Sequence, residues 1–246
     1  MDSLLILSVT AVAFLLAGFV KGVIGLGLPT VAIGLLGLVM TPSQAAAILV
    51  VPSLVTNVWQ LATGGDVKLL ARRMWPMLTG VCVGTFAGAV WLPPNIGQAS
   101  RWLGVALIVY AGLGLVKVHF KVRRRDETWL GLIVGILTGL ATVATGVFVI
   151  PGVPYITALE FDRDRMVQAL GLSFTVSTIT LALALAYQGQ IQGSIAWPAL
   201  IALAVALAGM WVGQLVRGKI KAETFRLFFF LGLLLLGGHL ALRGLL

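Results

Sequence analysis

The chain has few charged residues, few carboxylates and a single cysteine, and each shortage excludes a class of protein. Only 10 % of its 246 residues are charged and 59 % are apolar, whereas soluble domains carry about a quarter charged residues. Lipid must therefore be the solvent for most of the chain. The one cysteine, Cys82, excludes a disulfide framework and a cysteine metal cluster. In a membrane protein the net charge of +9 reports orientation, so we expect no nucleic-acid partner.

The N-terminus, Met1-Asp2-Ser3, lacks the basic region of a signal peptide, and we expect the apolar segment that follows it to be retained. Eight apolar stretches are long enough to enter a membrane. Six of them have about the 20 residues that a helix needs to cross the hydrocarbon, namely 45–63, 74–92, 102–118, 166–187, 195–216 and 226–245.

Two further stretches, 4–40 and 129–158, are too long for one span and too short for two. Glycine and proline interrupt both, and broken backbone at membrane depth is tolerated only where it is buried in protein or lines a cavity. We interpret both stretches as broken or re-entrant helix hairpins; ordinary helices with loosely packing glycines are the alternative. The interrupting residues are Gly18, Gly22, Gly25, Gly27, Pro29, Gly135, Gly139, Gly146, Pro151 and Pro154.

The two halves of the chain match each other at a nearly constant separation. Gln44-Ala45 recurs as Gln168-Ala169, 124 residues later, and Trp75-Pro76 recurs as Trp197-Pro198, 122 residues later. Gly84-x-x-x-Gly88 recurs as Gly209-x-x-x-Gly213, 125 residues later, and this spacing predicts close helix packing. The pattern indicates an internal duplication, which is typical of transporters.

The distribution of basic residues orients the two halves. If 129–158 is a hairpin with both ends on one side, 14 of the 17 basic residues lie on one face, and only Arg101 and Arg243 lie on the other, with Lys21 inside the membrane. Eight simple crossings would divide the basic residues nine to seven, against the excess that cytoplasmic loops carry. In the hairpin topology the corresponding loops of the two halves lie on opposite faces, as an inverted repeat requires.

The predicted fold is an all-α polytopic membrane protein with two inverted-topology repeats. Each repeat is a broken or re-entrant helix hairpin followed by three transmembrane helices. The N-terminal repeat covers 1–116, a basic cytoplasmic linker covers 117–128, and the C-terminal inverted repeat covers 129–246. The N-terminus is expected to face outward.

The side chains that catalysis or cation transport needs are missing from the apolar stretches. All eight acidic residues lie outside these stretches or at their ends, and His119 and His239 have no metal-ligand spacing with other candidates. Cation pumps rely on carboxylates buried at mid-membrane. We therefore expect no catalytic residue, no metal site and no cofactor, which argues against an enzyme.

Lys21 is the exception among the basic residues because apolar residues surround it. Its insertion into the membrane costs roughly 2.5–3.5 kcal/mol, and a functional role is the default interpretation; a lysine that snorkels to the interface is the alternative. Glycines expose backbone N–H groups beside it, and Pro29 suits the first turn of a following helix. A helix N-terminus beside a lysine makes an anion site.

Polar stripes follow both breaks. Ser53, Thr56, Asn57 and Gln60 lie on one helix face, and Ser173, Ser177 and Thr180 lie on another, with Thr178 beside them. Helix packing is the alternative role for the hydroxyls. We expect both stripes and both breaks to enclose one small polar cavity. The candidate substrate-binding residues are Lys21, Gly25, Gly27, Thr30, Ser53, Asn57, Gln60, Thr142, Thr145, Gly146, Ser173 and Ser177.

With these features the chain resembles the sulfite exporter TauE/SafE family over about residues 10–245. The resemblance rests on the glycine-rich segment around Lys21 that ends in Pro29, on its counterpart from Gly135 to Pro151, and on the basic linker in mid-chain. It implies a permease of the bacterial inner membrane, usually an exporter, for small anions such as sulfite or organosulfonates.

The sequence therefore predicts a secondary transporter that exports a small anion by alternating access. Its expected partners are a small anionic substrate and the lipid bilayer; a homo-oligomer stays an open alternative. A non-transporting membrane scaffold or assembly factor is the second hypothesis, since a scaffold would need neither Lys21 nor the paired breaks.

Overall fold

The structure is a computed structural model that describes residues 3–91, 96–116, 121–191, 193–219 and 221–242. Helices account for most of the described residues, and no β-strand occurs among them. In chain order the elements are α1 (Ser3–Ile24), α2 (Leu28–Leu36), α3 (Pro42–Ala62), α4 (Val67–Trp91), α5 (Ile96–Val116), the 3₁₀ turn η1 (Arg124–Asp126), α6 (Glu127–Thr145), α7 (Gly152–Ala158), α8 (Arg163–Tyr187), the 3₁₀ turn η2 (Gly193–Ile195), α9 (Ala196–Val216) and α10 (Ala222–Leu242).

Eight of the described helices are long and apolar enough to cross a membrane, and α2 and α7 are the short exceptions. The all-helical membrane fold is therefore confirmed. Each of the two irregular stretches begins with one long helix. α1 has 22 residues and α6 has 19, so each is by length a full span, and the break follows the helix.

The helix boundaries follow from local chemistry. α3 begins at a capping box, in which the backbone N–H of Gln44 donates to Thr41 Oγ1 (3.3 Å) and the Thr41 N–H donates to Gln44 Oε1 (3.2 Å). α8 begins after Asp162, whose Oδ1 accepts from the Arg165 N–H (2.9 Å). The first α6 residue, Glu127, falls within the predicted linker 117–128, of which residues 117–120 lie outside the described residues.

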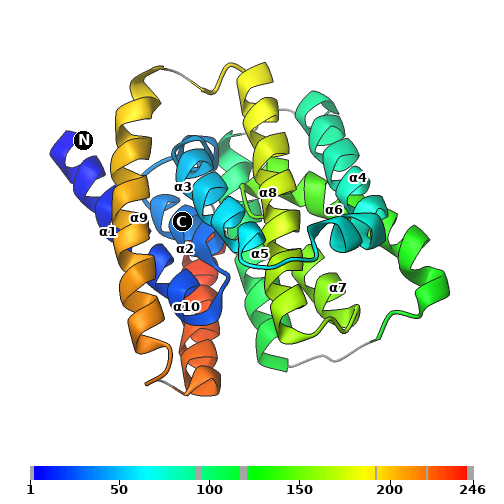
Figure 1. Cartoon of the computed structure of the whole chain (residues 1–246). Coiled ribbons are helices and arrows are strands. Elements are labelled where there is room, and N and C mark those ends of the chain that lie inside the picture. Colours follow the sequence, from blue (N-terminus) through cyan, green and yellow to red (C-terminus); the bar gives the residue numbers. More distant parts are fainter. Residues whose placement is uncertain (1–2, 92–95, 117–120, 192, 220, 243–246) are drawn as a thin grey trace.

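Two helix pairs are packed backbone to backbone, and each pair joins the two halves of the chain. α1 lies beside α9, and α4 lies beside α6 (Figure 1). A Cβ added to Gly209 of α9 would lie 2.2 Å from the Leu15 carbonyl oxygen, and one added to Gly84 of α4 would lie 2.2 Å from that of Ile136. The predicted packing role of these glycines is confirmed.

Some of the glycines interpreted as helix breakers also serve packing. Gly18 and Gly22 lie inside the continuous helix α1, where an added Cβ would approach the carbonyl oxygens of Ala206 and Met210 to 2.1 and 2.3 Å. Gly135 and Gly139 lie inside α6 in the same way. The breaks are therefore confined to 25–27 and 146–151.

Corresponding helices of the two halves pack against each other in antiparallel directions. In the α3–α8 pair, Ser53 lies opposite Thr178 and Leu61 lies opposite Gly171. Residue numbers therefore increase along α3 in the direction in which they decrease along α8. α5 packs against α10, its own counterpart. This arrangement supports the inverted repeat, which stays a prediction.

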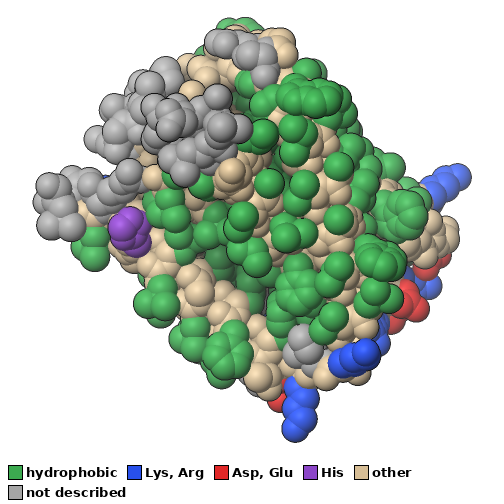
Figure 2. All heavy atoms as spheres, turned by 90° about the vertical axis from the view of Figure 1, so that its left-hand side faces the viewer, with side chains coloured by type: hydrophobic (Ala, Val, Ile, Leu, Met, Phe, Trp, Pro, Cys, Tyr) green, Lys and Arg blue, Asp and Glu red, His purple; other side chains and the backbone are tan. Residues whose placement is uncertain are grey.

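The surface is suited to lipid. On the side of the bundle where α1 and α9 lie, hydrophobic side chains cover most of the visible face, and the charged side chains gather along one edge (Figure 2). Large apolar residues are widely exposed on the long helices, including Trp211 at 62 % and Leu235 at 77 %. The chain is a multi-pass membrane protein.

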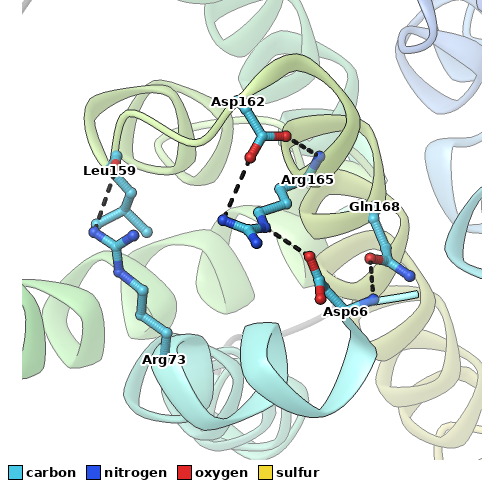
Figure 3. Close-up of polar contacts among 6 residues, drawn as sticks. All are labelled: Asp66, Arg73, Leu159, Asp162, Arg165 and Gln168. Carbon is cyan, nitrogen blue, oxygen red and sulfur yellow. Dashed lines mark hydrogen bonds and ion pairs between the residues drawn. The ribbon is translucent and has the colours of Figure 1, made fainter. Parts of the chain in front are cut away.

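Arg73 joins both ends of the α6–α7 hairpin. It lies near Asp66, Asp162 and Arg165 (Figure 3), and we name this end of the bundle the charged edge. Its Nη2 atom donates to Glu127 Oε1 (2.6 Å), at the start of α6, and to the Leu159 carbonyl oxygen (3.1 Å), just after α7. Lys121 pairs with Glu160 nearby (2.7 Å). The two ends of this hairpin therefore lie on the same side, as the hairpin interpretation of 129–158 predicts.

Single-cysteine labelling tests which side of the membrane carries this charged edge. In a Cys82→Ser background, an impermeant thiol reagent added from outside should label a cysteine at position 191 and should label one at position 122 only after permeabilisation. The reason is that cytoplasmic loops carry the excess of Lys and Arg. Labelling of position 122, and never of 191, from outside would overturn the orientation.

Candidate functional site

Lys21 lies in the last turn of α1 and is 5 % exposed. Its ammonium group donates to Thr56 Oγ1 (3.0 Å) and to Asn57 Oδ1, both on α3. The side chain is thus turned into the bundle, so the snorkelling alternative is wrong. Lys21 makes no ion pair with any carboxylate that the structure describes. The result is a buried cation held only by neutral oxygen atoms.

Asn57 extends the contacts of Lys21 to the second half of the chain. Because its Oδ1 accepts from Lys21, its Nδ2 points the other way and donates to Ser53 Oγ (3.0 Å) and to Thr178 Oγ1 (3.3 Å). Ser53 Oγ and Thr178 Oγ1 are 3.2 Å apart. All these side chains are buried. A continuous polar chain therefore runs from α1 through α3 to α8.

Gln60 lies one turn further along α3 and connects the first break to α8. Its Nε2 donates to the carbonyl oxygens of Gly25 (3.1 Å) and Val167 (3.0 Å). The side chain is buried, and its Oε1 has no hydrogen-bond partner among the described residues. A buried acceptor without a donor is unfavourable, so this atom is a candidate ligand contact.

The first break is built from two glycines with positive φ. Gly25 has φ +78° and Gly27, which precedes the first residue of α2, has φ +100°, a region that residues with a Cβ avoid. Pro29 occupies the first turn of α2, as predicted. Thr30 follows it, and its buried hydroxyl has no partner in the described structure. A Cβ added to Gly25 would have no neighbour within 4 Å, so open space adjoins the break.

The second break uses its hydroxyl groups differently. Thr142 Oγ1 donates to the Thr138 carbonyl oxygen (2.7 Å) and Thr145 Oγ1 donates to that of Ala141 (2.7 Å), within α6 itself. Gly146 then ends α6, and an added Cβ there would contact Ile33 and Ala46. These hydroxyls are therefore occupied by their own helix, as the packing alternative for serine and threonine predicts.

The two breaks contact α3 at different positions along its length, and the single polar cavity stays a prediction. Gly25 contacts Gln60 near the end of α3, whereas Gly146 lies against Ala46 near its beginning. Residues 46 and 60 differ by 14 positions along one helix, a rise of about 21 Å. The structure thus brings Lys21, Ser53, Asn57, Gln60 and Gly25 together, and it places Thr142, Thr145 and Gly146 elsewhere.

The remaining candidates lie on α8, which packs against both α3 and α4. Ser173 and Ser177 are buried, and Ser177 Oγ has no partner among the described residues. Thr178 contacts Asn57 and Ser53 instead, and Thr56 accepts from Lys21. Both belong to the polar stripes, but neither is among the candidate substrate-binding residues. Thr178 follows Ser53 by 125 residues, nearly the repeat separation, and that signal could have identified it.

A second polar network joins α3 and α8 at the charged edge (Figure 3). Arg165 Nε donates to Asp66 Oδ2 (2.6 Å), and Arg165 also pairs with Asp162 (3.4 Å). Gln168 Oε1 accepts from the Asp66 N–H (3.1 Å), and its Nε2 donates to the Leu61 carbonyl oxygen (2.9 Å). Together with Gln60 these contacts form what we name the α3–α8 clasp (Gln60, Asp66, Arg165 and Gln168).

Comparison with known proteins identifies the family of the chain. The searches of curated proteins and of solved structures found no match. The family model described as "Sulfite exporter TauE/SafE" matches residues 10–240, nearly the whole chain. The chain therefore belongs to the sulfite exporter TauE/SafE family, a family of membrane transporters.

Proposed function

We propose that the protein is a secondary transporter that exports a small anion, such as sulfite or an organosulfonate, across the bacterial inner membrane. One observation carries the proposal: among the described residues, the buried Lys21 ammonium donates only to the neutral oxygens of Thr56 and Asn57. An uncompensated buried charge is costly, and intramembrane ionisable groups mark substrate pathways. A bound anion would supply the missing negative charge.

In the proposed site each group has a separate task. Lys21 supplies the charge, Asn57 orients its ammonium, and the backbone N–H groups of Gly27, Leu28 and Thr30 supply directional hydrogen bonds at the start of α2. Gly25 leaves room for the anion to approach. The buried and unpartnered Thr30 hydroxyl supports this placement. Thr142, Thr145, Gly146, Ser173 and Ser177 belong to the corresponding region of the other half, which we propose lines the path.

Alternating access between the two halves is the proposed mechanism. The antiparallel packing of α3 on α8 supports an inverted repeat, in which equivalent gates lie at opposite ends. The α3–α8 clasp, of which Gln60 is a member, joins the two helices at the charged edge. We propose that this edge is cytoplasmic and that opening the clasp gives the anion access to Lys21 from inside the cell.

A thermal-shift screen of the purified protein tests this function against the scaffold hypothesis. Sulfite, alkanesulfonates, sulfate and carboxylates are added separately, and a ligand at a hundred times its Kd stabilises the protein by about 2.7 kcal/mol. We expect at least one anion to raise the melting temperature of the wild type and of Lys68→Ala, which removes an exposed lysine, and to have no effect on Lys21→Ala. The absence of a shift with every anion would favour the scaffold.

A further inference from the structure

Gln60 presents a fixed acceptor beside the cation. Both hydrogens of its Nε2 are used, one by the Gly25 carbonyl oxygen (3.1 Å) and one by that of Val167 (3.0 Å). Turning the amide around would bring Oε1 against two carbonyl oxygens, so the orientation of the amide is determined by its partners. Oε1 is therefore the free atom, it is buried, and it can only accept a hydrogen bond.

The position of this acceptor matches a ligand bound at Lys21. Asn57 and Gln60 are three residues apart and lie on the same face of α3. Gly25 follows Lys21 by four residues, just after the end of α1. The residues of α3 that contact Lys21 and Gly25 are therefore separated by about one helical turn, roughly 5 Å. The open space at Gly25 adjoins the same place. A small oxyanion is of the size to contact both groups at once.

The charge around the acceptor limits the charge of the ligand. Lys21 is the one charged side chain that contacts Thr56 or Asn57 in the described part of the chain. A monovalent anion would neutralise it, whereas a divalent anion would leave a net negative charge buried, which is unfavourable. A fully deprotonated oxyanion would also turn one of its own acceptors toward Gln60 Oε1.

We propose, on the basis of the proposed function, that the site selects the singly charged and singly protonated form of an oxyanion, with the O–H of the ligand donating to Gln60 Oε1. Hydrogensulfite has this form and sulfite does not. Gln60 is then the residue that discriminates between the two protonation states, because an acceptor without a donor is penalised. Each anion carried would take its own proton with it.

The titratable groups around Gln60 are few, and they constrain the test. On the elements that pack against α3, α2 and α9 carry none. The titratable groups on the other neighbouring helices are Lys21 on α1, Arg163, Asp164, Arg165 and Tyr187 on α8, and Arg101 and Tyr110 on α5. Asp66, which precedes α4, is paired to Arg165. A pH series must therefore separate titration of the ligand from titration of Lys21.

Methanesulfonate supplies that separation, because it is a monovalent anion at every working pH and has no hydrogen-bond donor. The affinities of the full-length protein for sulfite and for methanesulfonate are measured between pH 6 and pH 9, and their ratio removes any effect that the protein's own groups have on both. We expect this ratio to fall about tenfold per pH unit once the sulfite dianion predominates, because only the protonated fraction binds.

Gln60→Met provides the second readout, and Gln188→Met is the matched control, since Gln188 also donates to a carbonyl oxygen between helices, that of Ala89 (3.1 Å). At pH 6 the sulfite-to-methanesulfonate ratio should fall roughly tenfold in Gln60→Met and stay unchanged in Gln188→Met. A sulfite-to-methanesulfonate affinity ratio that is constant with pH in the wild type would overturn the selection of the protonated anion and leave the proposed function intact. This wild-type measurement tests the proposal even if Gln60→Met fails to fold. Binding of neither anion would overturn the function itself.

Discussion

Lys21→Met is expected to abolish anion binding, and Lys21→Arg to preserve binding while stopping transport. Methionine keeps the approximate volume of lysine without its charge. Removing one partner of a buried, hydrogen-bonded charge pair costs about 2–5 kcal/mol, so the Kd should rise by more than about thirtyfold. In the free protein Lys21→Met leaves Thr56 Oγ1 donating to the Pro52 carbonyl oxygen (2.8 Å) but removes the donor to Asn57 Oδ1.

The arginine variant separates binding from turnover. Arginine keeps a positive charge at the site, so we expect its Kd to stay within about tenfold of the wild type. Lysine can lose its proton, and the empty site can then return through the membrane without a buried charge; arginine does not lose its proton. A carrier that alternates with loss of this proton should therefore bind anion but not turn over in Lys21→Arg.

The measurement has two parts. Anion affinity is determined against pH for the wild type, Lys21→Met and Lys21→Arg, and flux is determined in proteoliposomes, with Lys68→Met as the control for removing an exposed lysine. If Lys21→Met binds the anion as tightly as the wild type at every pH, Lys21 has no part in the site. If Lys21→Arg transports at the wild-type rate, the proton on Lys21 does not alternate during the cycle.

The functional cation and the breaks were predictable because their signals are local. Lys21 stands inside a long apolar run, whereas the other charged residues lie outside the apolar stretches or at their ends. Gly25 and Gly27, followed by Pro29, show where a helix must stop and another begins, and the structure has that break. The packing of Gly84 and Gly209 was likewise readable from their spacing.

The position of each break along the bundle was not predictable, because hydrophobic periodicity assigns a residue to a helix face but not to a position along the membrane normal. Gly18 and Gly25 look alike in sequence, yet the first packs on α9 and the second opens the backbone. The difference depends on a partner helix from the other half of the chain. For the same reason Gly25 and Gly146 occur at opposite ends of α3, although their sequence contexts correspond.

The hydroxyl groups illustrate a second limit. Thr142 and Thr178 both donate to a carbonyl oxygen of their own helix, Thr142 to that of Thr138 and Thr178 to that of Phe174, each at 2.7 Å. Thr178 also accepts from Asn57 because α3 crosses α8 at that point. No pattern within one helix distinguishes the two threonines. Only the crossing of two segments more than a hundred residues apart does so.

Gly84→Val and Gly209→Val are expected to prevent stable folding, each by separating a helix pair. The Cβ of the new residue would lie 2.2 Å from the Ile136 or Leu15 carbonyl oxygen, so the helices must move apart by about an ångström or more. Overpacking costs typically 1–3 kcal/mol, and backbone contacts can yield only by moving a whole helix, so we expect values at or above the upper end of that range.

Gly232→Val is the matched control, because Gly232 lies in α10 and an added Cβ there would have no neighbour within 4 Å. Thermal unfolding of detergent-purified protein, together with the yield of monodisperse material, measures all three variants. The control should behave like the wild type, and near-equal melting temperatures for all of them would show that these contacts do not hold the fold. The two pairs α4–α6 and α1–α9 each join opposite halves of the chain, so either substitution should release an interface between the halves. Gly84→Val and Gly209→Val should therefore lower stability to a similar extent even though they lie 125 residues apart.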